Sequence, residues 1–354
     1  MASCSKVLSV TTVAAILYEQ GILDLYMPVA DPRLLGPEFA QHGKEDIRVL
    51  NLLLHNAGFA PDPVPFFNTA EFNCPNTEMY HPALNFSCMP QIYPAILAQK
   101  LINPVNHVYV YSDLSFMTLM LVTGKLVIEE KLIHVSSYLP ACFPAVEHDV
   151  SVSYICAFEA FFRDIVVNSK QLHLSNTGFL PNVSAFASMS APTENDTVYM
   201  HQVIQGVVSD GNAYAMGGIG GHAGLFSTAT DTARIALSWM ENAAEEVRLL
   251  SPATIALFTK EFNHTQSSRA LGWNTNDPTV VDSGWGQSCG NMTAVTYMHI
   301  GYTGTEVCID PVREYYTVFL TNRVYPTYLN DRMNQARREF NDAVLAVMVK
   351  EDAA

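Results

Sequence analysis

The sequence predicts an α/β fold of the α+β type, in which a large helical lobe is joined to an antiparallel sheet flanked by helices. Two observations predict it. Apolar residues recur at helical spacing through much of residues 7–260, and strand-like segments gather after residue 265. We therefore expect a single domain over residues 1–354. Its helical lobe spans 7–260 and contains an irregular insertion over 60–106, and its strands and last helix occupy 265–354.

The predicted helices of the lobe each combine apolar spacing with a residue that suits one end. The first extends over residues 3–20, and Gly21 follows it where a left-handed C-terminal cap is expected. Gly58 closes a second helix over residues 47–55. Further helices are expected over 112–124, 151–167 and 231–240, the last with Ser227 or Thr228 as its N-cap.

The C-terminal part changes character. Residues 307–309 and 315–320 are rich in β-branched and aromatic residues and are separated by a turn over 310–313, which predicts two paired strands. An amphipathic helix follows, with Asn330 or Asp331 able to cap it. Its apolar face consists of Met333, Ala336, Phe340, Val344 and Val347.

Composition limits the partners. The chain of 354 residues has 34 acidic and 19 basic side chains, so its formal charge of −15 argues against nucleic acid and anionic membrane surfaces. A neutral or cationic small molecule suits it better, and a homo-oligomer remains open. No apolar run reaches the roughly 18 residues that a membrane helix needs.

The cysteines and the N-terminus bear on the compartment. Seven cysteines, an odd number with no Cys-x-x-Cys pair, favour reduced thiols, and no metal-ligand spacing appears, so no metal or cofactor is expected. Without a visible signal segment a cytoplasmic location is favoured. Triplets of the form Asn-x-Ser/Thr, such as those at Asn85 and Asn195, are therefore interpreted as chance matches.

Ser3 and Lys6 form the first segment that could carry chemistry. The Ser-x-x-Lys spacing puts a hydroxyl and an ammonium one helical turn apart on the same face, where a base can take the serine proton. A serine at a helix N-terminus also has its own N–H free for an oxyanion. Roughly one such tetrad is expected by chance in a chain of this size, so alone it favours a solvated lysine beside a capping serine.

Two later segments complete the pattern. Tyr111-Ser112-Asp113 precedes a helix, and a tyrosine hydroxyl near a lysine can transfer protons. Taken alone, however, the segment is better explained by a half-buried aromatic side chain at Tyr111 and a helix N-cap at Asp113. Residues 299–305 alternate glycine with hydroxyl side chains just before a strand, which lets backbone N–H groups approach a ligand, or simply makes a turn. The three segments in this order make the chance explanation weak.

On these residues the chain resembles the penicillin-recognising serine hydrolases, the family of class C β-lactamases, DD-peptidases and esterase-like relatives. The match also includes residues 52–58, the glycine-rich loop 217–227 and Thr321-Asn322-Arg323, so it covers nearly the whole chain. The resemblance implies a β-lactamase/transpeptidase-like fold and an acyl-enzyme mechanism.

The resemblance also implies a role for each matching residue. Ser3 would be the acylated nucleophile, Lys6 and Tyr111 the proton-transfer pair, and Asp113, where many relatives carry Asn, a contact to substrate and Lys6. The N–H groups of Ser3 and Tyr302 would form the oxyanion hole. Further substrate-binding candidates, the last two from loops that border the cleft in relatives, are His299, Gly301, Thr303, Asn212 and Glu194.

Departures from the family pattern bear on the substrate. Where β-lactam-handling members have Lys-Thr-Gly, this chain has His299-Ile300-Gly301, and a neutral imidazole beside a side chain without a hydroxyl holds an anion poorly. We therefore favour hydrolysis of a small neutral ester or amide. The alternatives are a β-lactamase or DD-peptidase proper, and a non-catalytic member used for binding or assembly.

The start of the chain is the other departure. Relatives place a helix and two strands before the nucleophile, and only two residues precede Ser3 here. The sheet is therefore expected to be incomplete, with an unpaired edge along the strand at 315–320. A start downstream of the true one is favoured over completion by another chain or a degenerate copy.

Overall fold

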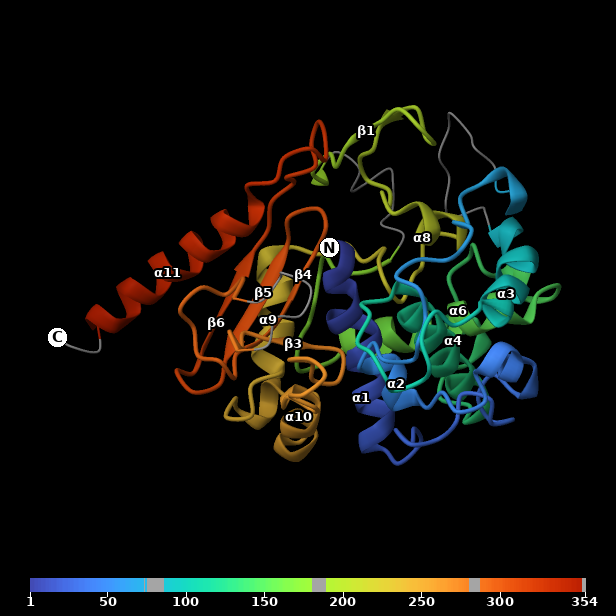
Figure 1. Ribbon diagram of the computed structural model, residues 1–354, viewed down its shortest axis with the longest axis horizontal. Coiled ribbons are helices and arrows are strands. Elements are labelled where there is room, and N and C mark those ends of the chain that lie inside the picture. The colour runs from blue at the N-terminus through green and yellow to red at the C-terminus, as the bar shows by residue number, and fades with distance from the viewer. Residues whose placement is uncertain (73, 75–85, 180–188, 280–286, 352–354) are drawn as a thin grey trace.

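A computed structural model describes residues 1–72, 74, 86–179, 189–279 and 287–351 (Figure 1). It has an α+β architecture: helices form one side of the molecule, an antiparallel sheet forms the other, and the first residues lie between the two. The predicted fold class is confirmed. One continuous hydrophobic cluster joins the two sides, because it contains Val7 of the first helical segment and Val307 of the sheet.

The first helical segment is composite. A 3₁₀ turn over Ala2–Cys4 continues into a π-helix over Lys6–Thr11 and then into α1 (Thr12–Glu19). Gly21 has a φ of 72°, as expected for the left-handed cap that the sequence predicts. The other helices on this side are α2 (Val49–Leu53), α3 (Met89–Ala98), α4 (Asp113–Glu129), α5 (Phe143–Val146), α6 (Val150–Phe161) with a π-helical extension over Phe162–Val167, and α8 (Gly211–Ala215).

Among the described residues, the main sheet has four antiparallel strands in the order β3-β4-β5-β6. They are β3 (Asn274–Thr275), β4 (Tyr297–Ile300), β5 (Glu306–Asp310) and β6 (Tyr315–Phe319). The two strands predicted after residue 265 are thus confirmed as β5 and β6, and in the part of the chain that the structure describes β6 forms one edge. A second, two-stranded sheet pairs β1 (Asn195–Asp196) with β2 (Gln202–Val203).

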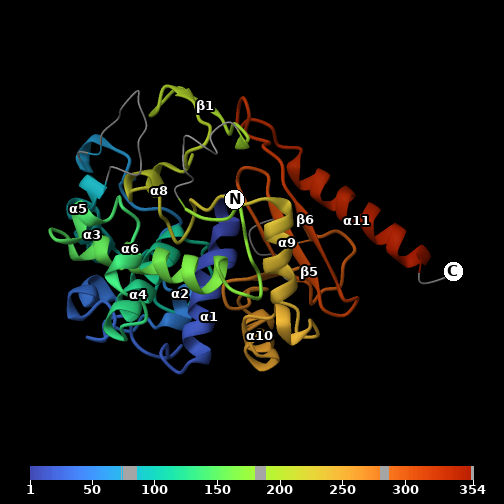
Figure 2. The ribbon, with the colours of Figure 1, turned by 180° about the vertical axis from the view of Figure 1, so that it is seen from behind.

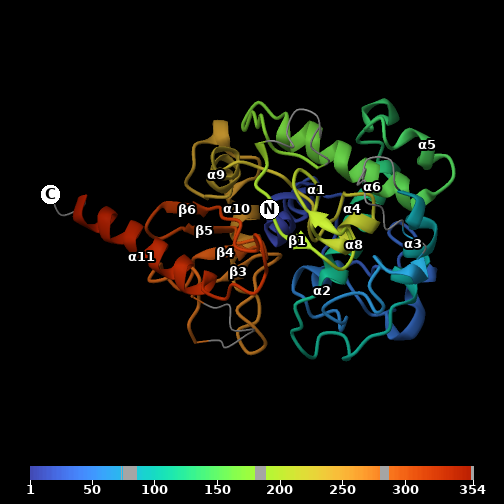
Figure 3. The same ribbon diagram turned by 90° about the horizontal axis from the view of Figure 1, so that it is seen from above.

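Helices cover both faces of the main sheet. Figures 2 and 3 show α9 (Ala229–Ser238) against one face and α11 (Met333–Glu351) along the other, with α10 (Pro252–Thr259) beside α9. Strand β5 alternates accordingly: Val307 and Ile309 join the main core, whereas Cys308 lies in a smaller cluster with residues of α11. Thr228 caps α9, which is one of the two caps predicted for it.

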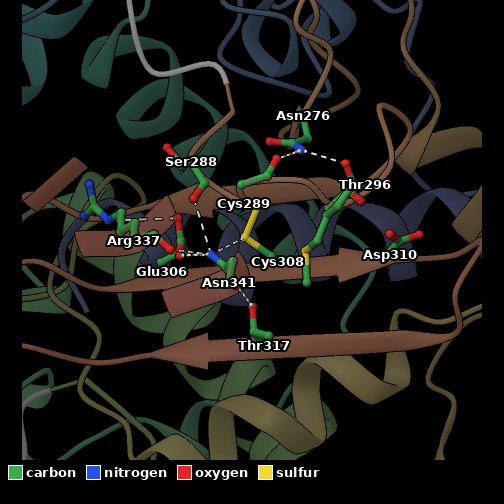
Figure 4. Close-up of a disulfide and its surroundings, with 12 residues drawn as sticks. Asn276, Ser288, Cys289, Thr296, Glu306, Cys308, Asp310, Thr317, Arg337 and Asn341 are labelled. Atoms are coloured by element: carbon green, nitrogen blue, oxygen red, sulfur yellow. Dashed lines mark hydrogen bonds and ion pairs between the residues drawn. A yellow bond between two sulfur atoms is a disulfide. The ribbon is translucent and has the colours of Figure 1, made fainter. Parts of the chain in front are cut away.

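The prediction of reduced thiols is wrong for six of the seven cysteines. The chain forms the disulfides Cys74–Cys88, Cys142–Cys156 and Cys289–Cys308, and only Cys4 is free and buried. Figure 4 shows Cys289–Cys308 tying the loop after β3 to strand β5. The pairs are 14 to 19 residues apart, so their proximity depends on the fold and no short sequence motif indicates it.

The prediction of an irregular insertion over residues 60–106 is also partly wrong. It contains α3, whose Met89, Ile92 and Ile96 are buried, and Pro90 occupies a first-turn position where the missing N–H costs nothing. Residues 73 and 75–85 of this segment, with Asn85, lie outside the described residues. No helix among those described is long and apolar enough to cross a membrane.

Candidate active site

Ser3 and Lys6 face each other at the start of the composite helix. The Lys6 ammonium donates a hydrogen bond to Ser3 Oγ at 3.0 Å, because the two residues are one helical turn apart. Lys6 is completely buried, whereas Ser3 keeps partial exposure and lines the main cleft. The predicted pair therefore has the geometry of a nucleophile with an adjacent proton-transfer group.

All three donors of Lys6 have an acceptor. Besides Ser3 Oγ, its Nζ reaches the carbonyl oxygen of His222 at 3.1 Å and Asp113 Oδ1 at 2.7 Å. Burial by itself would lower the pKa of Lys6, but the Asp113 carboxylate and Tyr111 outweigh it and hold the pKa above its ordinary value. Lys6 is therefore an ammonium in the resting site.

Tyr111 lies next to Lys6. Lys6 Nζ lies 4.8 Å from the centre of its ring. Burial raises the pKa of the Tyr111 hydroxyl, while Lys6 and the hydrogen bonds with Lys6 and Ser3 act in the opposite direction. The resting tyrosine is a neutral phenol within reach of both partners.

The segment around Tyr111 is fixed by its neighbours. His55 Nδ1 accepts a hydrogen bond from the Ser112 N–H at 3.0 Å, and the His55 ring stands 4.6 Å from the Tyr111 ring. Ser112, rather than the expected Asp113, caps helix α4. Asp113 is thereby left free to pair with Lys6. Residues Val108 and Val110, just before Tyr111, belong to no strand.

The end of β4 forms the opposite wall. Gly301 lies so close to the chain start that a Cβ on it would meet the Met1 carbonyl oxygen at 2.6 Å, and would also collide with Thr305 Oγ1. Thr305 Oγ1 in turn donates to the Met1 carbonyl at 2.8 Å. These contacts place the turn that carries Tyr302 and Thr303 beside Ser3.

His299 is buried within β4, and the segment from His299 to Thr305 leads directly into β5, as predicted. Its Nδ1 donates to the Ile300 carbonyl at 2.8 Å, which leaves Nε2 as an acceptor. Burial, and then the charges of Arg269 and Lys6, hold the pKa of His299 well below its ordinary value. The imidazole is neutral, as the sequence argument assumed.

The remaining candidates differ in position. Glu194, Tyr302 and Thr303 line the cleft together with Ser3. Asn212 does not line it; its Oδ1 accepts a hydrogen bond from the Phe67 N–H at 2.9 Å and so holds the loop before α3. The cleft has a volume of about 1520 Å³.

Sequence reasoning missed Arg269. The residue is only 4% exposed, its guanidinium stands 5.2 Å from the centre of the Tyr111 ring, and it lines the cleft. Its Nε donates to the Tyr109 hydroxyl at 3.1 Å, and no carboxylate among the described residues pairs with it. Nothing in the local sequence around Arg269 indicates this position.

The sequence reasoning also missed an Asp210–His222 pair. Their side chains are 3.0 Å apart, and Asp210 caps α8, in a segment interpreted as a loop. Burial by itself would raise the pKa of Asp210, but His222 and the Ala213 N–H lower it to about 2. Asp113, Asp210 and His222 place ligand-type atoms within 4.8 Å of one another. Both carboxylates already have partners, Lys6 and His222, so we assign no metal to this group.

Comparisons with known proteins identify the family of the chain. A family model described as beta-lactamase matches residues 1–126 and 168–342. A putative D-alanyl-D-alanine carboxypeptidase of Escherichia coli K12 is 26% identical over 309 residues, which are 84% of this chain and 62% of that protein. A Salmonella schwarzengrund protein with the same description is 26% identical over 82% of this chain and 61% of its own length. The chain thus spans less than two thirds of these curated relatives.

Solved structures show the same fold at lower identity. EstCE1, described as a hydrolase with promiscuous acyltransferase activity, has a TM-score of 0.59 at 17% identity and covers 96% of this chain and 84% of its own. A penicillin-binding protein homologue from Caulobacter crescentus has a TM-score of 0.60 at 17% identity, with 96% and 81% covered. A mutant of the simvastatin synthase from Aspergillus terreus has a TM-score of 0.61 at 16% identity, with 99% and 81% covered.

Proposed function

We propose that this chain, which belongs to the beta-lactamase family, is a serine hydrolase that cleaves a small ester or amide through an acyl-enzyme. The observation that carries the proposal is the hydrogen bond from the Lys6 ammonium to Ser3 Oγ, beside Tyr111 and in an open cleft. A degenerate, non-catalytic chain has no requirement to keep three such groups in contact.

The reaction would proceed in two steps. Ser3 Oγ attacks the acyl carbon and forms an ester bond with it, while the Ser3 proton passes through Lys6 and Tyr111 to the leaving alcohol or amine. A water molecule then attacks the acyl carbon, and the bond between that carbon and Ser3 Oγ breaks. One proton of the water passes through the same pair to Ser3 Oγ, and the carboxylic acid leaves. Because Lys6 rests as an ammonium and Tyr111 as a neutral phenol, one proton must move from Lys6 to the Asp113 carboxylate before Lys6 accepts the Ser3 proton.

The negative charge on the carbonyl oxygen needs donors. We assign this role to the backbone N–H groups of Ser3 and Tyr302, which belong to segments that the Gly301 contacts hold together. Gly301, Thr303 and Glu194 would contact the substrate from the cleft wall, and Asp113 would contact it from beside Lys6.

The electrostatics of the cleft support a neutral acyl group. His299 is neutral, Ile300 has no hydroxyl, and the carboxylates Asp62, Asp113, Glu194 and Asp210 line the same cleft. A substrate carboxylate next to these groups would be repelled unless a cation offsets them.

One observation favours a second candidate, a DD-carboxypeptidase. Arg269 provides a buried cation in the cleft without a carboxylate partner among the described residues, and a terminal substrate carboxylate would supply one. The curated relatives described as putative D-alanyl-D-alanine carboxypeptidases agree with this candidate.

A labelling experiment tests the proposal. A fluorophosphonate probe should modify the wild-type chain at Ser3, and a chromogenic acyl ester should give a burst of product. Ser3→Ala should lose both, whereas Ser209→Ala, at another serine that lines the cleft, should keep both. Equal labelling of Ser3→Ala and wild type would overturn the proposal. Release of D-alanine from an acylated D-Ala-D-Ala peptide, abolished in Arg269→Met while ester turnover persists, would select the second candidate.

A further inference from the structure

We propose that Asn195, Asn263 and Asn291 are acceptor sites for N-linked glycans, in a chain that folds in an oxidising secretory compartment. Each asparagine begins an Asn-x-Thr triplet, completed by Thr197, Thr265 and Thr293. Two further triplets begin at Asn85 and Asn182, which lie outside the described residues. The proposal is independent of the hydrolase activity.

All three asparagines are exposed, and they lie on separate parts of the surface. Asn195 is in β1, Asn263 is in the connection between α10 and β3, and Asn291 follows the disulfide-bonded Cys289. A glycan is bulky and hydrophilic, so an acceptor must point into solvent in the folded chain. The three positions meet that requirement.

The side chains of these asparagines do not hold the fold together. Among the described residues, the only hydrogen bond found for any of the three amides is within its own triplet, from Thr265 Oγ1 to Asn263 Oδ1 at 2.8 Å. Modification of the amide nitrogen would therefore break no contact with the rest of the fold.

Asparagines outside such triplets behave differently. Several are buried and hold the fold together, as Asn56 does through Asn106 and Gln266, and as Asn341 does through Glu306 and Thr317. Six asparagines are buried among the residues that the structure describes, and none of them begins an acceptor triplet: Asn51, Asn56, Asn212, Asn274, Asn276 and Asn341. Acceptor triplets and structural amides are thus separate groups in this chain.

The disulfides supply the second, independent observation. Six of seven cysteines are paired, which is typical of proteins that fold in the secretory pathway and rare in the cytosol. That compartment is also where acceptor triplets are modified. The reason for interpreting these triplets as chance matches was the absence of evidence for secretion, and the three disulfides now provide such evidence.

The modification is a group transfer from a lipid-pyrophosphate-linked oligosaccharide. The bond between the anomeric carbon of the first sugar and the pyrophosphate oxygen breaks, and a bond from that carbon to the asparagine amide nitrogen forms. The nitrogen loses one proton, and the lipid pyrophosphate leaves. Oxidation states do not change.

The test uses the full chain behind a cleavable secretion signal in a eukaryotic cell. The secreted protein should migrate faster after treatment with peptide-N-glycosidase, and the enzyme should convert Asn195, Asn263 and Asn291 to aspartate, as read by peptide mass spectrometry. Thr265→Ser should keep the glycan at Asn263 and Thr265→Ala should lose it, while both keep the other two.

Two results would overturn the proposal. One is secreted, folded protein in which all three asparagines are unmodified. The other is a mobility shift that is as large in the triple variant Asn195→Gln, Asn263→Gln, Asn291→Gln as in the wild type. That result would place the glycans at other residues. If the triple variant is secreted poorly, the Thr265→Ser and Thr265→Ala variants still test the proposal, because they differ from each other only by the hydroxyl oxygen.

Discussion

The carboxylate of Asp113 lies 2.7 Å from the ammonium of Lys6, a side chain that is completely buried. The pair explains why Lys6 keeps its proton in a site that would otherwise favour a neutral amine, since burial alone lowers the pKa of Lys6. It also makes Asp113 a determinant of the pH at which Ser3 can be activated.

Asp113→Asn should therefore move the pH dependence of the reaction. Loss of the carboxylate lowers the pKa of Lys6, so the free amine becomes available at lower pH. The rising limb of kcat/KM against pH should shift down by about 1–3 pH units, the usual effect of a neighbouring opposite charge. The profile is measured with a chromogenic ester.

The matched control is Asp331→Asn, which removes a carboxylate from the rim of the same cleft without touching Lys6. Asp331→Asn should leave the rising limb of kcat/KM at the same pH as in the wild type. An unchanged or upward-shifted limb in Asp113→Asn would show that Asp113 does not set the protonation of Lys6.

Gly301→Ala tests the contact between β4 and the chain start. The added methyl group would meet the Met1 carbonyl and Thr305 Oγ1, so either the strand or the chain start must move. Overpacking of this kind costs about 1–3 kcal/mol, and the free energy of unfolding should fall by that amount in urea denaturation. Gly178→Ala, where nothing lies within 4 Å of the new Cβ, should be neutral. Equal stability of the two variants would contradict the close approach.

The three segments of the proposed site could be recognised in the sequence because each is short and its residues are close together in the chain. Ser3 and Lys6 meet through one helical turn, and His299 to Thr305 is a strand end with glycines. These features need no knowledge of the fold. The same holds for β5 and β6, which are joined by a turn and pair with each other.

Contacts between distant segments could not be predicted. Arg269 and Tyr111 are 158 residues apart in the chain but in contact in the fold. Asp210 pairs with His222 and also caps a five-residue helix. Asn212 binds Phe67 and does not line the cleft. The disulfides could not be predicted for a related reason. The number and the spacing of the cysteines do not indicate a pair that the fold brings together, as it does Cys289 and Cys308.

The disulfides predict a thiol count. The chain has seven cysteines and three disulfides, so 7 − 6 leaves one thiol, that of Cys4. Titration with a thiol reagent in denaturant should find one thiol per chain before reduction and seven after it. Cys4→Ala should reduce the first number to zero. Seven thiols in protein secreted through an oxidising compartment would contradict the pairing.

Glu306 makes stability depend on pH. It is fully buried on β5, where Asn341 Nδ2 donates to its Oε2 at 2.8 Å and Arg337 stays 4.0 Å away (Figure 4). Burial raises the pKa of Glu306 to about 7, against the smaller effects of Arg337 and Asn341. In the unfolded chain the group returns to its ordinary value of 4.5.

The sign of the effect follows from that difference. A raised pKa in the folded state contributes stability that is fully present below pH 4.5 and is lost as the pH rises through about 7. From pH 4.5 to pH 8 the loss due to this group is about 3 kcal/mol. Glu306→Gln cannot ionise and keeps an acceptor for Asn341, so its unfolding free energy should match wild type at pH 4.5 and exceed it at pH 8. Glu314→Gln, at an exposed turn, should follow the wild-type curve. Parallel curves for wild type and Glu306→Gln would show that Glu306 is ionised in the folded chain throughout this range.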